Sequence, residues 1–187
     1  MDMFDGVGRR RDQTGGFLDI GQHSLNGYER NVLFRNDGDG TFTDVGYPNG
    51  ADRVEDGRGV SVLDYDGDGR LDVLIRNYRQ PAELLHGVSP RTGAGPHWLE
   101  LRLVGTRSNR DAVGARVRLH TARGAQTRVV TAGSGYLSGS SLVLHFGLGP
   151  AAAADDVEVT WPSGARQTIG TLAADRHWTL VEGEPPR

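Results

Sequence analysis

Four carboxylates within one nine-residue loop, residues 64–72, constrain the fold of this chain more than any other feature. They stand at positions 1, 3, 5 and 9, with glycine at position 6, which is the spacing of a loop that binds calcium through oxygen ligands. Without a cation, like charges at this spacing repel one another and oppose a compact loop. The flanking segments 60–63 and 71–75 are rich in β-branched residues and predict strands. We therefore expect a metal-binding loop between two β-strands.

Calcium is the metal that this loop predicts. The expected ligands are the carbonyl oxygen of Arg70 and the side chains of Asp64, Asp66, Asp68 and Asp72, the last directly or through water. Magnesium suits the loop less well, because it demands a smaller, near-ideal octahedron. The chain has no cysteine, and no histidine lies near the loop in the sequence, which argues against zinc and copper. Position 12 is Ile75 rather than glutamate, which excludes an EF-hand and leaves a solvated acidic turn as the alternative.

The run Asp-Gly-Asp-Gly also occurs earlier in the chain, at residues 37–40. It lies between two segments that predict strands, 31–36 and 41–45, and therefore predicts a hairpin. Position 1 of this copy is Arg35, and its closing carboxylate, Asp44, falls one residue late. We interpret the earlier copy as a turn and not as a second metal site. The recurrence of the run indicates repeated β units.

Composition supports a loop-rich β protein, since only 36% of the 187 residues are hydrophobic and 28 are glycine. A net charge of −3 gives no reason to expect nucleic acid or an anionic membrane as a partner. No apolar stretch is long enough to span a bilayer, and the polar start of the chain is not a signal peptide. We expect either a cytoplasmic protein or one whose leader has been removed. The lack of cysteine leaves the redox compartment open.

Alternating hydrophobic residues dominate the chain from His97 onward. The alternating positions are Leu99, Leu101 and Leu103, followed by Ala115, Val117 and Leu119. Further predicted strands cover residues 126–131, 142–146, 157–161, 166–169 and 177–181, with a turn at 162–164. Such a series of short strands predicts a β-sandwich. The alanines at 151–154 are compatible with one short helical turn, which is the single helical alternative that the sequence offers here.

These patterns divide the chain into three segments. Residues 1–30 predict an irregular lead-in, residues 31–90 repeated β units with the calcium loop, and residues 97–184 the sandwich domain. Residues 87–96 contain two prolines and three glycines, which is typical of a linker.

Four ordered motifs of the second half resemble the ASPIC/UnbV domain of the cartilage acidic protein family. They are residues 108–115, Gly133-Ser134-Gly135-Tyr136-Leu137-Ser138, residues 145–149 and Trp161-Pro162-Ser163-Gly164. In the first half, residues 36–42 and 64–72 are similar to FG-GAP or VCBS repeats, which build propeller blades with calcium loops. The resemblance implies an all-β fold, with partial propeller-like FG-GAP/VCBS blades followed by a β-sandwich-like ASPIC/UnbV domain. It also implies an extracytoplasmic or secreted location.

The chain departs from this family in having about two repeats, too few for a whole propeller. Exposed sheet edges are sites of unwanted pairing. We therefore expect that the chain is a fragment, that the sandwich and lead-in cover the edge, or that a partner or self-association completes it.

No catalytic constellation emerges from the sequence. The six histidines show no paired metal spacing, and we interpret them as satisfied or exposed side chains. The serines at 134, 138, 140 and 141 lack the Gly-x-Ser-x-Gly motif and an evident base. For the polar loop 108–111 there are two interpretations. It contacts a ligand or the other domain, or it forms an Asx-type turn with an ion pair, either Arg110–Asp111 or interdomain, and we favour the turn. The three tryptophans have two interpretations, stacking on sugars at one surface or anchoring the core of the sandwich. We favour core anchoring for Trp98, Trp161 and Trp178.

Two function classes follow from these observations. The favoured one is a calcium-binding, non-enzymatic β module for interaction or ligand binding. Its expected partner is a protein or a carbohydrate, without nucleic acid or membrane insertion. The alternative is an enzyme or accessory protein in natural-product biosynthesis of the enediyne type, which the resemblance alone suggests.

Overall fold

The structure is a computed structural model that describes residues 29–88, 96–121 and 124–187. Most of the predicted lead-in and of the predicted linker at 87–96 therefore lies outside the described residues. The chain divides into two compact units. One consists of Met1–Gly57 with Asn77–Pro81, and the other of Arg58–Arg76 with Ala82–Arg187. Among the described residues, no helix is long and apolar enough to cross a membrane.

The first unit contains the predicted hairpin, formed by β1 (Phe34–Asn36) and β2 (Phe42–Asp44). The two strands are antiparallel, with Phe34 opposite Asp44. Gly38 and Gly40 have φ angles of 86° and 95°, so the turn uses the left-handed backbone that glycine adopts readily. A single 3₁₀ turn, η1 (Tyr47–Asn49), follows the hairpin. The hairpin prediction is confirmed, although both strands are shorter than expected.

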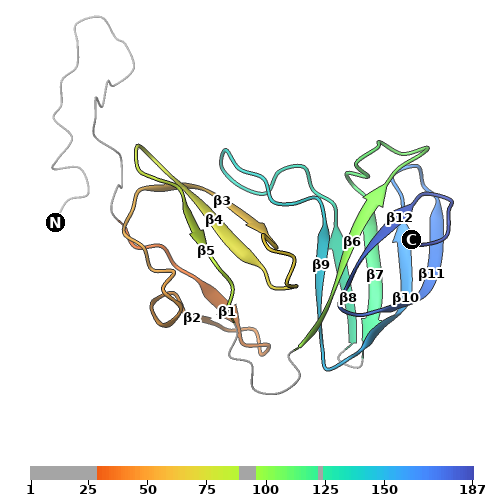
Figure 1. The fold of residues 1–187 in the computed structure, drawn as a ribbon, viewed down its shortest axis with the longest axis horizontal. Helices are drawn as coiled ribbons and strands as arrows, with labels where there is room; N and C mark the ends of the chain where they lie inside the picture. Colours follow the sequence, from red (N-terminus) through yellow and green to blue (C-terminus); the bar gives the residue numbers. More distant parts are fainter. Residues whose placement is uncertain (1–28, 89–95, 122–123) are drawn as a thin grey trace, which may run out of the picture. The chain divides into compact units, whose positions relative to one another are not determined.

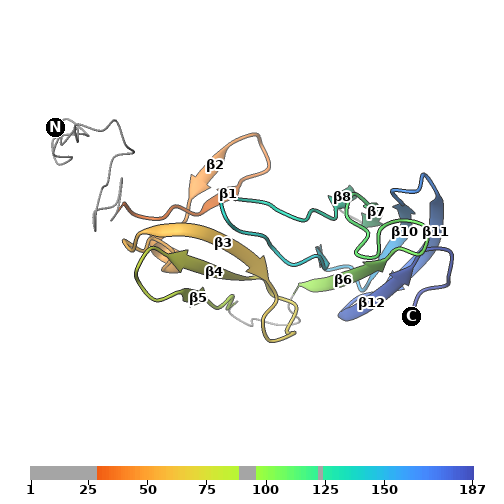
Figure 2. The same cartoon turned by 90° about the horizontal axis from the view of Figure 1, so that it is seen from above.

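A second sheet carries the acidic loop at residues 64–72. Its strands are β3 (Gly57–Leu63), β4 (Asp72–Asn77) and β5 (Glu83–Leu85), in that order across the sheet (Figure 2). β4 and β5 are antiparallel, and Val73 lies opposite Leu85. The loop thus joins two strands as predicted, whereas β5 was missed because three residues are too few for a clear alternating pattern.

The remaining strands form two sheets that pack on a common core (Figure 1). The strands are β6 (His97–Val104), β7 (Arg116–Thr121), β8 (Gly124–Val129), β9 (Leu144–Gly149), β10 (Ala153–Thr160), β11 (Arg166–Ala173) and β12 (Arg176–Val181). One sheet has the order β11-β10-β7-β8 and the other the order β12-β6-β9. β6 pairs with β12 in parallel and with β9 in antiparallel orientation.

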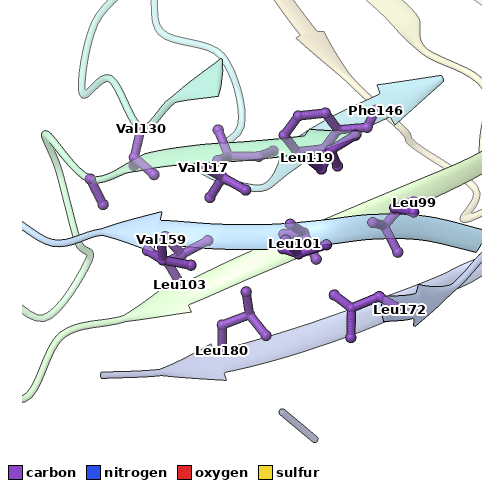
Figure 3. Packing of buried hydrophobic residues seen from close by; sticks show 14 of the residues in the cluster. Leu99, Leu101, Leu103, Val117, Leu119, Val130, Phe146, Val159, Leu172 and Leu180 are labelled. Carbon is purple, nitrogen blue, oxygen red and sulfur yellow. The ribbon is translucent and has the colours of Figure 1, made fainter. Parts of the chain in front are cut away.

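The core contains the alternating residues that the sequence predicts. Leu99, Leu101 and Leu103 of β6 face Val117 and Leu119 of β7 across the sandwich (Figure 3). Each of these side chains is buried, and burial of one such side chain contributes about 1.5–3 kcal/mol to the free energy of unfolding. The all-β prediction is therefore confirmed for the described residues.

Trp161 confirms the expectation of core anchoring. Its ring is buried in the core, and its Nε1–H donates a hydrogen bond of 2.9 Å to Oε1 of Gln167, which satisfies the only polar atom of the ring. Trp178 is half-buried and packs against the same core. The alanines at 151–154 do not form a helical turn, because Ala153 and Ala154 begin β10 and pair with Ala173 and Leu172 of β11.

The connection after β6 is organised around a buried carboxylate, Glu182. Its Oε2 atom accepts hydrogen bonds from the N–H groups of Thr106, Arg107 and Ser108, at 3.0, 2.8 and 2.8 Å. Burial opposes ionisation, but the Ser163 hydroxyl and these N–H groups outweigh it and lower the pKa of Glu182 to about 2.

The polar loop at 108–111 is closed by the Asn109 side chain over four residues, and not by the two-residue bond of the predicted Asx-type turn. Oδ1 of Asn109 accepts a hydrogen bond of 2.8 Å from the N–H of Val113, and Nδ2 of Asn109 donates one of 2.9 Å to the Val113 carbonyl. Asn109 therefore closes the loop with its own side chain.

Candidate metal centre

The acidic loop is wrapped around its first carboxylate, Asp64. Oδ1 of Asp64 accepts hydrogen bonds from the N–H groups of Gly67 and Asp68, at 2.8 and 3.2 Å, and Oδ2 accepts one of 2.7 Å from Gly69. Gly67 and Gly69 have φ angles of 75° and 83°, which glycine adopts without strain. Oδ1 uses both of its lone pairs on these donors, whereas Oδ2 accepts one bond and retains a lone pair. Asp64 thus shapes the loop and still offers a lone pair of Oδ2 to an ion.

The last carboxylate, Asp72, is almost completely buried, with 1% of its surface exposed. Its oxygens accept hydrogen bonds from Tyr65 N–H at 2.7 Å and Gly87 N–H at 2.8 Å. Burial opposes ionisation, but these two donors and the nearby His86 and Arg70 outweigh it and lower the pKa of Asp72. Asp72 is therefore held as a buried carboxylate anion at the end of the loop.

Three of the predicted ligands lie together. Asp64, Asp66 and Asp72 each offer a carboxylate oxygen, and these oxygens lie within 4.8 Å of one another. Calcium binds oxygen at about 2.3–2.6 Å, so two ligands on opposite sides of the ion are separated by about 4.6–5.2 Å. The three carboxylates consequently fit calcium in both spacing and donor type.

Asp68 and Arg70 take a different arrangement from the predicted one. The guanidinium of Arg70 forms an ion pair with Asp68 and donates a hydrogen bond of 2.8 Å from Nε to the carbonyl of Gly87. Asp68 belongs to a second group of possible ligand atoms, with Asp66 and His86. Asp66 is shared by both groups. The role of the Arg70 carbonyl and of Asp68 as calcium ligands stays a prediction.

His86 corrects the expectation that no histidine lies near the loop. Its Nε2 lies 3.8 Å from Oδ2 of Asp66, and its Nδ1 lies 3.9 Å from Oδ1 of Asp72. The antiparallel pairing of β4 with β5 returns the chain to the loop and places His86 beside Asp72. The absence of cysteine and the oxygen-rich ligand set still disfavour zinc.

The loop at 37–40 satisfies its carboxylates internally. Asp37 pairs with Nε of Arg35 at 2.8 Å and accepts a hydrogen bond of 2.6 Å from the Thr43 hydroxyl. Asp39 accepts hydrogen bonds from the N–H and hydroxyl of Thr41, at 2.9 and 2.6 Å. The pKa of Asp37 is lowered by Thr43 and Arg35, and that of Asp39 by Thr41. Neither carboxylate belongs to a group of three metal-type ligands within the described residues.

Other histidines are engaged in pairs, as expected for satisfied side chains. Nδ1 of His97 lies 2.7 Å from Oδ2 of Asp175, and Nδ1 of His177 lies 2.8 Å from Oε2 of Glu100. Burial raises the pKa of Glu100, and the negative charge of Asp64 raises it further. The neighbouring His177 and His145 lower this pKa but do not outweigh the burial. His23 lies outside the described residues.

Comparison with known families agrees with this architecture. Residues 105–187 match the family described as ASPIC and UnbV. Residues 16–75 match an FG-GAP-like repeat, and residues 57–95 match an FG-GAP repeat that includes the acidic loop. The chain therefore belongs to the class of all-β proteins in which FG-GAP-type repeats precede an ASPIC/UnbV domain.

Among individual proteins, the chain is similar to cartilage acidic protein 1. It is 39% identical to the mouse protein over 155 residues, which are 81% of this chain and 23% of the mouse protein. It is 39% identical to the human protein over 137 residues, which are 71% of this chain and 20% of the human protein. The frog Xenopus tropicalis protein is 40% identical over 112 residues. The chain thus spans less than a quarter of the length of these relatives.

Proposed function

We propose that residues 64–72 bind calcium, and that this chain is a calcium-stabilised β module for interaction rather than an enzyme. The observation that carries the proposal is the spacing of three carboxylate oxygens, from Asp64, Asp66 and Asp72, within 4.8 Å of one another. Three negative charges at this separation repel one another strongly, and a hard divalent cation removes the repulsion. The match of residues 57–95 to an FG-GAP repeat is a second support.

Each residue of the loop has its own part in holding the ion. Asp64 and Asp72 are fixed by backbone donors, so their oxygens are already oriented before the ion arrives. Asp66 supplies an exposed carboxylate, and Asp68 and the carbonyl oxygen of Arg70 complete the ligand set. The ion contributes structural cross-linking of the loop and the ends of β3 and β4.

The interaction role is supported by an exposed apolar loop between β8 and β9. Tyr136 and Leu137 are 72% and 85% exposed, and Leu137 has a φ of 48°, an unusual conformation for a residue other than glycine. The isolated bridge between Gly135 and Ser138 holds these two side chains at the tip of a tight turn. Such a tip suits contact with a protein or carbohydrate partner outside the cytoplasm, where calcium reaches about 1 mM and sites bind it at about 10⁻⁴ M.

The proposal is tested by calorimetric titration of the chelator-treated chain with calcium, magnesium and zinc. For a Kd of about 10⁻⁴ M, 1 mM calcium raises the free energy of unfolding by about 1.4 kcal/mol. Asp66→Asn should abolish calcium binding because it removes the negative charge. The loop should suffer little damage, since the asparagine oxygen can still accept the 3.3 Å hydrogen bond that Asp66 accepts from Asp68 N–H. Asp39→Asn in the other loop is the matched control and should leave the Kd unchanged. A melting temperature that is indifferent to calcium and chelator, or a preference for zinc through His86, would contradict the proposal.

A further inference from the structure

The face of the β12-β6-β9 sheet that points away from the core carries polar and aromatic residues in register. His177 of β12 lies opposite Glu100 of β6, and Glu100 lies opposite His145 of β9. Trp98 lies two residues before Glu100, and its ring packs edge-on against His177 with centroids 5.0 Å apart. Glu100 is buried although it faces away from the hydrophobic core. Part of the chain therefore covers this face.

The acidic loop contacts this face through Gly69. Nε2 of His145 lies 2.9 Å from the carbonyl oxygen of Gly69, within hydrogen-bonding distance. The indole ring of Trp98 lies against Gly69 so closely that a Cβ atom at position 69 would stand 2.0 Å from Nε1. Position 69 therefore requires glycine for two reasons, since its φ of 83° is also left-handed.

Gly69 connects these contacts directly to the proposed ligands. Its N–H donates a hydrogen bond of 2.7 Å to Oδ2 of Asp64, while its carbonyl is the partner of His145. Arg70, whose carbonyl is a predicted ligand, is the next residue. The residue that contacts Trp98 and His145 is thus one hydrogen bond away from Asp64 and one peptide bond away from Arg70.

The strand that leads into the loop is held by the same domain. The Ser61 hydroxyl donates a hydrogen bond of 2.7 Å to the carbonyl of Gly139. The N–H of Val62 donates one of 3.2 Å to the Ser140 hydroxyl, and the N–H of Ser141 donates one of 3.3 Å to the carbonyl of Val62. The segment before β9 therefore fixes β3 at the point where the acidic loop begins.

We propose that Trp98 and His145 of the sandwich are positioning residues for the calcium loop, so that calcium binding and packing of the loop on the β12-β6-β9 sheet are energetically coupled. The inference rests on the proposed function. Because the contacts hold Gly69 in one conformation, they reduce the ordering that the loop must undergo when the ion binds. Coupling of this kind is reciprocal, so calcium strengthens the packing of the loop as much as the packing strengthens calcium binding.

The first test compares calcium affinities of full-length variants by calorimetry. His145→Ala should raise the Kd for calcium about tenfold, which lies within the usual range of coupling between sites. His145→Gln should restore most of the affinity, because the amide Nε2 of glutamine can donate to the Gly69 carbonyl from the same position. His120→Ala is the matched control, because His120 lies in β7 of the other sheet, and it should leave the Kd unchanged.

The second test is a spectroscopic signature that general destabilisation does not produce. The indole of Trp98 lies against the loop, so calcium should change the tryptophan fluorescence of the wild-type chain. The change should disappear in Trp98→Phe and persist in Trp178→Phe, whose ring packs on the core instead.

The outcomes separate this inference from the proposed function. Suppose that the wild-type chain binds calcium without a fluorescence response from Trp98, and that His145→Ala binds calcium equally well. The inference is then wrong and the proposed function stands. If the wild-type chain takes up no calcium, the proposed function itself is wrong, and the coupling fails with it. Tenfold weaker binding by His145→Ala, with rescue by His145→Gln, supports both.

Discussion

The hairpin loop at 37–40 and the acidic loop at 64–72 share the run Asp-Gly-Asp-Gly, which stands at 66–69 in the later loop. They differ in how their carboxylates are satisfied. In the earlier loop, Asp37 is neutralised by Arg35, and Asp39 is bonded by Thr41. In the later loop, Asp64 stands where Arg35 stands in the earlier one, and three carboxylates converge within 4.8 Å. The charge at position 1 and the place of the closing carboxylate, Asp44 or Asp72, therefore separate a self-contained turn from a candidate cation site.

The comparison also shows a difference in surroundings. A Cβ atom at Gly38 or Gly40 would meet no atom within 4 Å, whereas one at Gly69 would collide with the Trp98 ring. The earlier loop is shaped by its own side chains, and the later one is shaped also by residues distant in the sequence.

The largest effect is expected from alanine at the equivalent glycines. Gly69→Ala should lower the free energy of unfolding by about 2–5 kcal/mol, since it combines left-handed backbone strain with overpacking against Trp98. Gly40→Ala has a similar φ but open space around it, and should cost about 1–2 kcal/mol. Urea unfolding of the two variants measures both values, and equal losses would remove the distinction between the loops.

Glu182 provides a reference carboxylate that the protein satisfies without an ion. Glu182→Gln should lower the free energy of unfolding by about 1–3 kcal/mol, because the neutral amide is a weaker acceptor for the three N–H groups of residues 106–108. The loss should be the same in calcium and in chelator. A loss that depends on calcium would show that Glu182 is linked to the metal loop.

The pH dependence of stability follows from the same residue. The pKa of Glu182 is about 2 in the folded state, below its ordinary value, so the unfolded chain binds more protons as the pH falls. The stabilisation is fully present above the ordinary pKa and is lost as the pH falls toward 2. Thermal melting of the chelator-treated chain between pH 6 and pH 2 should therefore show a decline that is shallower in Glu182→Gln. Equal slopes would contradict the assigned pKa.

The smallest effect is expected from completing the earlier loop. Arg35→Asp supplies the missing carboxylate at position 1, but Asp44 falls one residue late and accepts a hydrogen bond of 2.8 Å from Gly46 N–H. We expect no calcium binding at 1 mM by calorimetry of this variant in an Asp66→Asn background. Binding in that background would mean that position 1 alone decides between turn and metal loop.

The sequence by itself determined the features that depend on local pattern. The alternation of Leu99, Leu101 and Leu103 predicted one buried face of β6, and the Asp-Gly spacing predicted a loop between β3 and β4. Turn and strand propensities act over a few residues, so both features can be read without knowledge of the rest of the chain. The same is true of the hairpin at 37–40.

Only the tertiary structure decided which distant residues meet. The pairing of β4 with β5 placed His86 beside Asp72, and the outer face of β6 and β9 brought Trp98 and His145 to Gly69. The alanines at 153–154 became strand because β11 supplies their hydrogen-bonding partner, which outweighs their helical propensity. Such contacts depend on strand order and register, which are set by how hydrophobic faces are buried together and leave no local trace in the sequence.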